Sequence, residues 1–287
     1  MVDGGEGGVG RYYVDNKYST KLLHFNEDDN EYALTTKPGS LKPELFTLSV
    51  WFKKDGYAVA DFTPANYMID NYRTTNYGWE MAMQTNGSLA FGFRSLKTET
   101  NYTYASGYRT FANDYVTRRY YDITGPSGNG WFNCVVTMDG RYLKMYINGE
   151  LERGGGILEI DGTDGHTVMY GSPEEQVAAI GGILQSNTHG LAMMNGWIDE
   201  LAVWDTALDA KTINILYNSG VSKHDLNVNI KNLDSRDGHD SIKPYVDHLI
   251  AWWRFEEGSG ETIKDHSKSG NDLQLYNTPT WSTDVPK

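Results

Sequence analysis

The chain has 287 residues, of which 39% are hydrophobic and 13% aromatic, enough for one large folded unit or two small ones. Its 38 acidic and 25 basic side chains give a formal net charge of −13, which argues against nucleic acid and anionic membranes as partners. The first ten residues lack the basic head and apolar centre of a signal peptide, and no run of 18 apolar residues predicts membrane insertion. Cys134 is alone, so we expect no internal disulfide and a small core residue.

The first predicted elements are two short strands around an acidic turn. Leu22–Phe25 and Glu31–Leu34 are rich in apolar residues, and Asn26–Asn30 between them is rich in turn formers. Phe46–Lys53 then alternates apolar and polar residues with the period of a strand and ends at an Asp-Gly turn.

Two hairpins are predicted further along the chain. Residues 79–84 and 89–93 flank Asn86-Gly87, a dipeptide typical of tight hairpin turns. Residues 131–137 and 143–147 flank an Asp-Gly turn in the same way. A chain of many short strands with glycine-rich turns predicts an all-β sandwich or jelly roll of antiparallel sheets.

Residues 195–217 change period midway. Residues 197–204 are mostly apolar, as in a strand, and are bounded by Trp197 and Trp204. After them, apolar residues fall near helical spacing, which predicts one short helix near 206–217 capped by Asp205 or Thr206.

Taken together, these segments resemble the laminin-G-like, concanavalin A-like lectin/glucanase superfamily. Phe46–Lys53 is similar to its Phe-Thr-Ile-Ser-x-Trp strand, and Trp131–Gly149 is similar to its Trp-x-x-Val hairpin ending in Asn-Gly. Gly196–Glu200 is similar to its Gly-x-Ile-Asp-Glu ending. The resemblance covers about residues 20–220 and implies a concanavalin A-like jelly-roll sandwich with one short helix. It leaves function open, because this fold carries many functions.

Four segments are expected along the chain. Residues 1–19 form a glycine-rich arm, residues 20–220 the laminin-G-like jelly roll, and residues 221–248 a polar connecting strap. Residues 249–287 resemble the strand and turn that normally open this sandwich, although here they come last. About 38 residues cannot fold alone, so we expect them to complete a sandwich, and favour the chain's own over a neighbour's.

Residues 97–130 depart from the family pattern, because this connection is long and rich in tyrosine. Tyrosine offers rigid contact area that can stack on sugars, and arginine offers donors to acidic partners. The residues can equally be strand positions that pack on the sandwich. The hypothesis is a binding site for a glycan or a protein subunit at Tyr102, Tyr104, Tyr108, Arg109, Tyr115, Arg118 and Arg119.

Calcium is the one metal that the sequence suggests, because some family members are expected to bind it through acidic rim loops. Asp28 with Asp29 forms one oxygen-rich turn, and Asp161 with Asp164 another. The simpler interpretation is that these are turn formers. No other cofactor is expected.

One carboxylate motif suggests catalysis, and a second pair of carboxylates suggests either a structural role or a ligand site. Glu159-Ile160-Asp161 resembles the start of the Glu-x-Asp-x-x-Glu strand motif of a related glycosidase class, but Asp164 stands where the last glutamate belongs. Asp199 and Glu200 should point to opposite sides of their strand, and we favour a carboxylate that accepts backbone N–H bonds over a ligand. We therefore expect a protein that is not an enzyme.

The leading hypothesis is a structural, decoration or adhesion protein on a virion surface, in the manner of phage proteins. Its partners would be other virion subunits, its own copies or cell-surface glycans. One alternative is an extracellular carbohydrate-binding module of a larger secreted protein, and the other is a glycoside hydrolase that uses Glu159 and Asp161.

Overall fold

The computed structural model describes the chain in segments. These are residues 19–54, 66–71, 78–83, 89–93, 130–152, 157–159, 164–170, 177–186, 189–191, 193–217 and 243–286. All structural statements below concern these residues.

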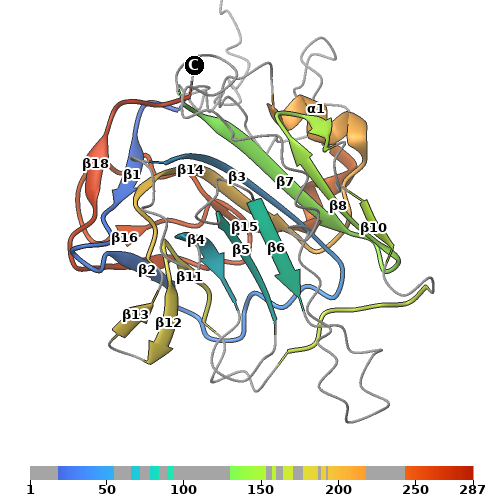
Figure 1. The fold of residues 1–287 in the computed structure, drawn as a ribbon, viewed down its shortest axis with the longest axis horizontal. Helices are drawn as coiled ribbons and strands as arrows, with labels where there is room; N and C mark the ends of the chain where they lie inside the picture. The colour runs from blue at the N-terminus through green and yellow to red at the C-terminus, as the bar shows by residue number, and fades with distance from the viewer. Residues whose placement is uncertain are drawn as a thin grey trace, which may run out of the picture.

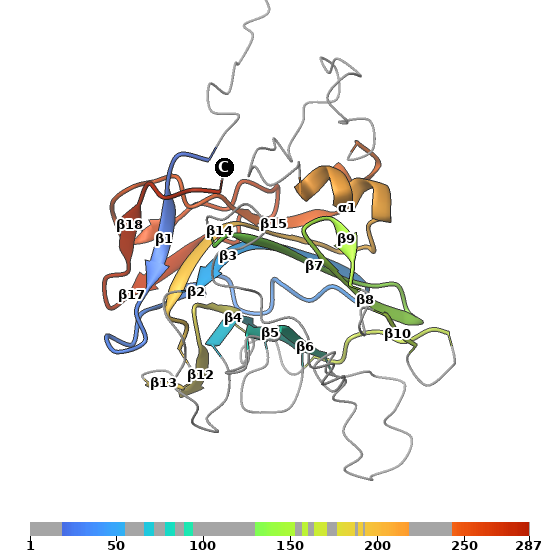
Figure 2. The same cartoon turned by 45° about the horizontal axis from the view of Figure 1, so that its top comes forward.

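The described strands form two large antiparallel sheets that face each other, with a small hairpin beside them (Figure 2). Sheet A has nine strands, in the order β10 (Ile157–Glu159), β8 (Tyr142–Ile147), β7 (Phe132–Met138), β3 (Phe46–Lys54), β14 (Gly196–Trp204), β1 (Leu22–Phe25) and β18 (Thr280–Ser282), with β9 (Glu150–Leu151) beside β8 and β15 (Leu249–Trp253) beside β14. Sheet B has seven, in the order β16 (Thr262–Ile263), β17 (Leu273–Tyr276), β2 (Tyr32–Thr35), β11 (Ala179–Ile180), β4 (Asn66–Asp70), β5 (Trp79–Met83) and β6 (Leu89–Phe93). The hairpin joins β12 (Ile183–Ser186) to β13 (His189–Leu191). The predicted all-β sandwich and both predicted hairpins, β5–β6 and β7–β8, are thus confirmed.

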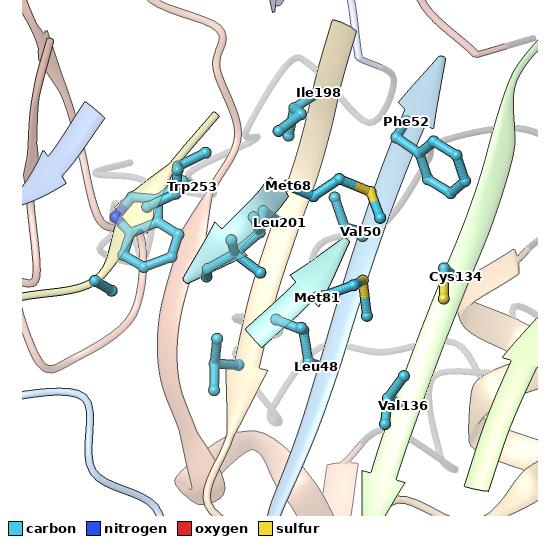
Figure 3. Packing of buried hydrophobic residues seen from close by; sticks show 14 of the residues in the cluster. Leu48, Val50, Phe52, Met68, Met81, Cys134, Val136, Ile198, Leu201 and Trp253 are labelled. Atoms are coloured by element: carbon cyan, nitrogen blue, oxygen red, sulfur yellow. The ribbon is translucent and has the colours of Figure 1, made fainter. Parts of the chain in front are cut away.

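The core lies between the two sheets, where alternate residues of each strand point inward. Leu48, Val50 and Phe52 of β3 do so beside neighbours from β7 and β14 (Figure 3). Met68 and Met81 meet them from sheet B. Each such side chain contributes about 1.5–3 kcal/mol when fully buried.

Cys134 belongs to this core and is completely buried, as predicted. Burial raises the pKa of its thiol well above the ordinary value, because no charged form is stabilised there. The thiol is therefore an inert packing group.

A bulge in β14 corrects the predicted alternation of Asp199 and Glu200. Ile198 and Leu201 both face the core, with two residues between them instead of one, and the register with β3 shifts at this point. Glu200 has a φ of 46°, and its N–H donates to Asp199 Oδ1 at 2.9 Å. Both carboxylates therefore lie on the outer side of sheet A and both are buried. The preferred interpretation, a carboxylate that accepts a backbone N–H, is confirmed for Asp199.

One helix, α1 (Ala210–Tyr217), covers part of the outer face of sheet A (Figure 2). Ile213 and Leu216 pack there against Trp204 and Trp252. The predicted cap is wrong: the helix begins at Ala210, and Asp209 Oδ1 accepts the Thr212 N–H at 2.7 Å.

Asp205, one of the two predicted caps, serves another contact. Its carboxylate bonds His248 Nδ1 at 2.7 Å, at the end of the 3₁₀ helix Lys243–His248. No helix in the described part of the chain is long and apolar enough to cross a membrane.

The C-terminal segment enters the sandwich of its own chain. β15 pairs with β14, β17 with β2, and β18 with β1, so both sheets contain it (Figure 1). Trp253 of β15 is fully buried in the core, and its Nε1–H donates to Asn271 O at 2.7 Å. The same segment also binds residues that precede β1: Glu256 accepts the Ser19 hydroxyl at 2.8 Å and the Thr20 N–H at 2.7 Å.

Candidate functional site

The outer face of sheet B carries the most exposed aromatic group of the described chain. Ala33 of β2 and Leu275 of β17 point into the core, so their neighbours Tyr32 and Tyr276 point outward. The register places these two tyrosines directly opposite each other. We call this pair the tyrosine platform.

The two rings of the tyrosine platform stack closely. Their centroids are 4.9 Å apart and their planes differ by 11°. Tyr276 is 39% exposed, whereas Tyr32 is 4% exposed and rests on Ala179 and Met193. The inner ring is thus held in place, and the outer ring presents a supported surface to solvent.

Burial raises the pKa of the Tyr32 hydroxyl, with a smaller contribution from Tyr276. The Tyr32 hydroxyl therefore stays protonated at neutral pH and can donate a hydrogen bond.

Polar turns border the tyrosine platform. Asn277, the residue after Tyr276, donates through Nδ2 to Asn30 O at 2.8 Å, although the two are 247 residues apart in sequence. The contact joins the turn after β17 to the acidic turn between β1 and β2. Asp28 and Asp29 of that acidic turn are exposed. The amide of Asn277 therefore lies next to an aromatic surface, and the acidic turn is joined to it through Asn30. A polar group beside an aromatic ring is the combination that binds polar rings with an apolar face.

A row of outward residues crosses sheet B next to the tyrosine platform. From β16 to β5 the register aligns them strand by strand. At the far end, Asp70 and Glu80 lie opposite each other, and both are buried. The row in order is Thr262, Gln274, Leu34, Ala179, Asp70 and Glu80.

The acidic turn does not assemble a calcium site. Asn26 uses Oδ1 to accept the Asp28 N–H at 3.0 Å and uses Nδ2 to donate to Asp29 Oδ2 at 2.6 Å. Glu31 accepts the Asn26 N–H at 2.8 Å, and burial raises the pKa of its carboxyl. These oxygens are engaged within the turn, which is the arrangement of a turn former.

The second predicted calcium turn is only partly described. Asp164 pairs with Arg141 at 3.1 Å, while Asp161 lies outside the described residues. Within the described segments, no three His, Cys, Asp or Glu side chains converge as metal ligands would. The described residues of the two turns therefore do not form a calcium site.

The other predicted site residues fall largely outside the described segments. This holds for Tyr102, Tyr104, Tyr108, Arg109, Tyr115, Arg118 and Arg119. Glu159 ends β10, at the edge of sheet A, and its side chain is among those not described.

Glu200 is the most perturbed carboxyl group on sheet A. Its Oε2 accepts the Trp252 Nε1–H at 2.6 Å, and its Oε1 accepts the Arg254 Nε–H at 3.1 Å. Both partners of the ion pair are 8% exposed in their side chains. Burial raises the Glu200 pKa from 4.5 to about 7, against the opposing effect of Arg254. The group ties β15 to β14, so we assign it to stability.

The tyrosine platform was not predicted from the sequence. Tyr32 was placed in a strand after the acidic turn, and Tyr276 lies in the segment expected to return to the sandwich. The usable signal is alternation, because each tyrosine neighbours a core residue and so must face outward. That the two meet follows only from the pairing of β17 with β2.

Comparison with known proteins agrees with the fold. The sequence profile of the concanavalin A-like lectin/glucanases superfamily matches residues 27–214. No curated protein matches the chain in sequence. A crystal structure of a proposed carbohydrate-binding protein from Bacteroides ovatus superposes with a TM-score of 0.56 at 16% identity, over 94% of this chain and 61% of that one.

Two more distant solved structures are similar over part of the chain. The binding domain of botulinum neurotoxin DC in complex with SialylT has a TM-score of 0.43 at 20% identity, over 69% of this chain and 41% of that one. A heptameric SAP-like pentraxin from Limulus polyphemus has a TM-score of 0.43 at 16% identity, over 70% and 83%. The chain thus spans 61% or less of the first two of these proteins.

Proposed function

The chain belongs to the concanavalin A-like lectin/glucanase superfamily, and we propose that it is a carbohydrate-binding module whose sugar site is the tyrosine platform. One observation carries the proposal. Tyr276, 39% exposed, is the most exposed large hydrophobic side chain among the described residues, and it is stacked on a buried second ring. An aromatic group held in this way loses little conformational entropy when a ligand packs on it.

The surroundings of the ring suit a sugar. The apolar face of a pyranose can pack on Tyr276, while its hydroxyl groups exchange hydrogen bonds with polar groups at the rim. Asn277 and the exposed Asp28 and Asp29 supply such groups. A rim of this kind favours neutral sugars over acidic ones, because two carboxylates repel a third.

The test is a panel of neutral oligosaccharides bound by the wild-type chain and by Tyr276→Ala. We expect the substitution to weaken binding of the best ligand about tenfold, the cost of one lost aromatic contact. Tyr142→Ala is the matched control, since Tyr142 is a partly exposed strand tyrosine on sheet A. Equal loss in both variants, or no loss in either, would contradict the proposal.

We also propose that the module binds sugars without cleaving them. The glycosidase alternative needs Glu159 and Asp161, and β10, which Glu159 ends, lies at the edge of sheet A. The tyrosine platform is on sheet B, so these residues would act away from the sugar proposed to bind there. Prolonged incubation with the best ligand should release no new reducing ends.

The biological setting stays a prediction from the sequence. One predicted setting is a virion surface, where the partners would be other virion subunits or further copies of the chain. The other is a larger secreted protein that contains this module. Glycan recognition serves either one, and the Tyr276→Ala test applies to both.

A further inference from the structure

A second row of side chains lies on the outer face of sheet A. The register aligns Thr280 of β18, His24 of β1, Trp197 of β14 and Lys53 of β3 across four neighbouring strands. Their neighbours Leu23, Ile198 and Phe52 face the core, so the row faces outward. We call these four residues the indole row.

Each member of the indole row contacts the next one across the neighbouring strands. The His24 and Trp197 rings lie 4.7 Å apart at 51°, and Lys53 Nζ lies 5.0 Å from the Trp197 ring centroid. Thr280 Oγ1 lies 3.5 Å from His24 Nδ1. His24, Trp197 and Lys53 are partly exposed and Thr280 is exposed, so the row forms an accessible surface.

The chemistry of the indole row is that of a donor surface. An ammonium, an indole N–H and a hydroxyl of the row can all donate hydrogen bonds, and the row itself contains no carboxylate. His24 packs among them, with Nε2 buried and Nδ1 beside the Thr280 hydroxyl. Lys53 gives the row its formal positive charge, so this local surface favours a ligand that carries a negatively charged group.

The chain itself shows which group fits Lys53. The carboxylate of Asp284, near the C-terminus, forms an ion pair with Lys53 Nζ, and the backbone oxygen of Asp284 accepts the Trp131 Nε1–H at 2.8 Å. The Lys53 side chain is 22% exposed beside this ion pair, so part of it is accessible to a ligand carboxylate. Asp284 would then compete with the ligand.

We propose that the indole row is a second binding site, for a carboxylated sugar such as a uronic acid. This goes beyond the proposed function, because it places a different ligand class on a different sheet. The row spans three strand spacings, about 14 Å, the length of a short oligosaccharide. It offers side-chain donors beside an aromatic body, the combination that suits a sugar ring with hydroxyl and carboxylate groups.

The probe is a galacturonic acid trisaccharide, with the matched neutral galactose trisaccharide as comparison, titrated into the full chain by calorimetry at low salt. We expect Lys53→Gln to weaken binding of the acidic sugar about tenfold, the size of one lost charged contact. Asp284→Asn should strengthen it, because a competing carboxylate is removed. A gain of affinity cannot come from unfolding.

Lys144→Gln is the matched control. Lys144 is also a sheet A lysine with a carboxylate partner, Asp139 at 3.1 Å, and an aromatic neighbour, Tyr142 at 5.3 Å, but it lies on β8, away from the indole row. Its substitution should leave the affinity for the acidic sugar unchanged.

Four results would overturn the inference. The first is that the acidic sugar binds neither the wild-type chain nor Asp284→Asn. The second is that Lys53→Gln and Lys144→Gln have the same affinity for the acidic sugar. The third is that an oligoglutamate peptide of equal charge competes as well as the sugar. Loss of acidic sugar binding in Tyr276→Ala would also overturn it, by moving the ligand to the tyrosine platform. The proposed function is tested separately, because its test uses neutral sugars and the variant Tyr276→Ala.

Discussion

The part of sheet A that α1 covers and the outer face of sheet B use aromatic residues in opposite ways. On sheet A, Trp204 and Trp252 are buried beneath α1, and Trp51 stacks on Tyr217 at the end of that helix. On sheet B, Tyr32 supports Tyr276, which remains 39% exposed. A strand aromatic therefore serves stability or recognition according to what covers it, and the residue type alone does not decide between them.

The largest expected effect on stability comes from replacing Glu200 on the covered part of sheet A. Glu200→Ala should lower the free energy of unfolding by about 3–5 kcal/mol, because buried Arg254 loses the carboxylate that accepts its Nε–H. Denaturant unfolding measures this change. If the loss is within about 0.5 kcal/mol, as for an ordinary surface site, the assignment of Glu200 to stability is wrong.

Glu200 should also make stability depend on pH. Because burial raises its pKa from 4.5 to about 7, the folded protein holds a proton that the unfolded chain has lost between these values. The contribution is fully present below pH 4.5 and is lost as pH rises through 7, by up to about 3 kcal/mol. Unfolding of the wild-type chain and of Glu200→Gln across this range tests the slope, which the variant should largely lack.

Substitution on the open face should have the reverse profile. Tyr276→Ala should cost about 1.5 kcal/mol of binding to the best neutral sugar, yet change the free energy of unfolding by less than about 1 kcal/mol, since the ring is exposed. Calorimetric titration and denaturant unfolding on the same sample separate the two quantities. A variant that loses stability but keeps its affinity would reverse the contrast.

The smallest effect concerns the helix that covers sheet A. Asp209→Ala should destabilise the fold by about 1 kcal/mol through loss of the helix cap. Asp205→Ala, at one of the caps predicted from the sequence, removes only an exposed contact to His248 and should cost less than about 0.5 kcal/mol. Equal losses would show that the cap is not specific.

Local patterns predicted the fold well. Both hairpins were predicted from a dipeptide typical of turns, Asn86-Gly87 or Asp139-Gly140, between two strand-like segments. The sequence signal is local, because the paired strands are neighbours along the chain. The alternation of residues 46–53 likewise predicted the strand β3, whose alternate residues Leu48, Val50 and Phe52 enter the core. The helix was predicted too, but its start was placed early, because Asp205, Thr206 and Asp209 are all acceptable caps.

Features that depend on distant partners were not predicted. The bulge at Asp199–Glu200 lies where β14 changes its partner on the side away from β3, from β1 up to Ile198 to β15 from Leu201, and alternation within one strand cannot express that. The tyrosine platform needs β17 beside β2, and the indole row needs β18 and β1 beside β14. Sequence patterns predict which face a residue takes, whereas topology decides what it meets there.

The most direct test of the central claim is a crystal structure of the chain with its best neutral oligosaccharide. We predict a sugar ring in van der Waals contact with Tyr276, with hydroxyl groups hydrogen-bonded to the rim that includes Asn277. A neutral sugar bound elsewhere, with Tyr276 still facing solvent, would contradict the account.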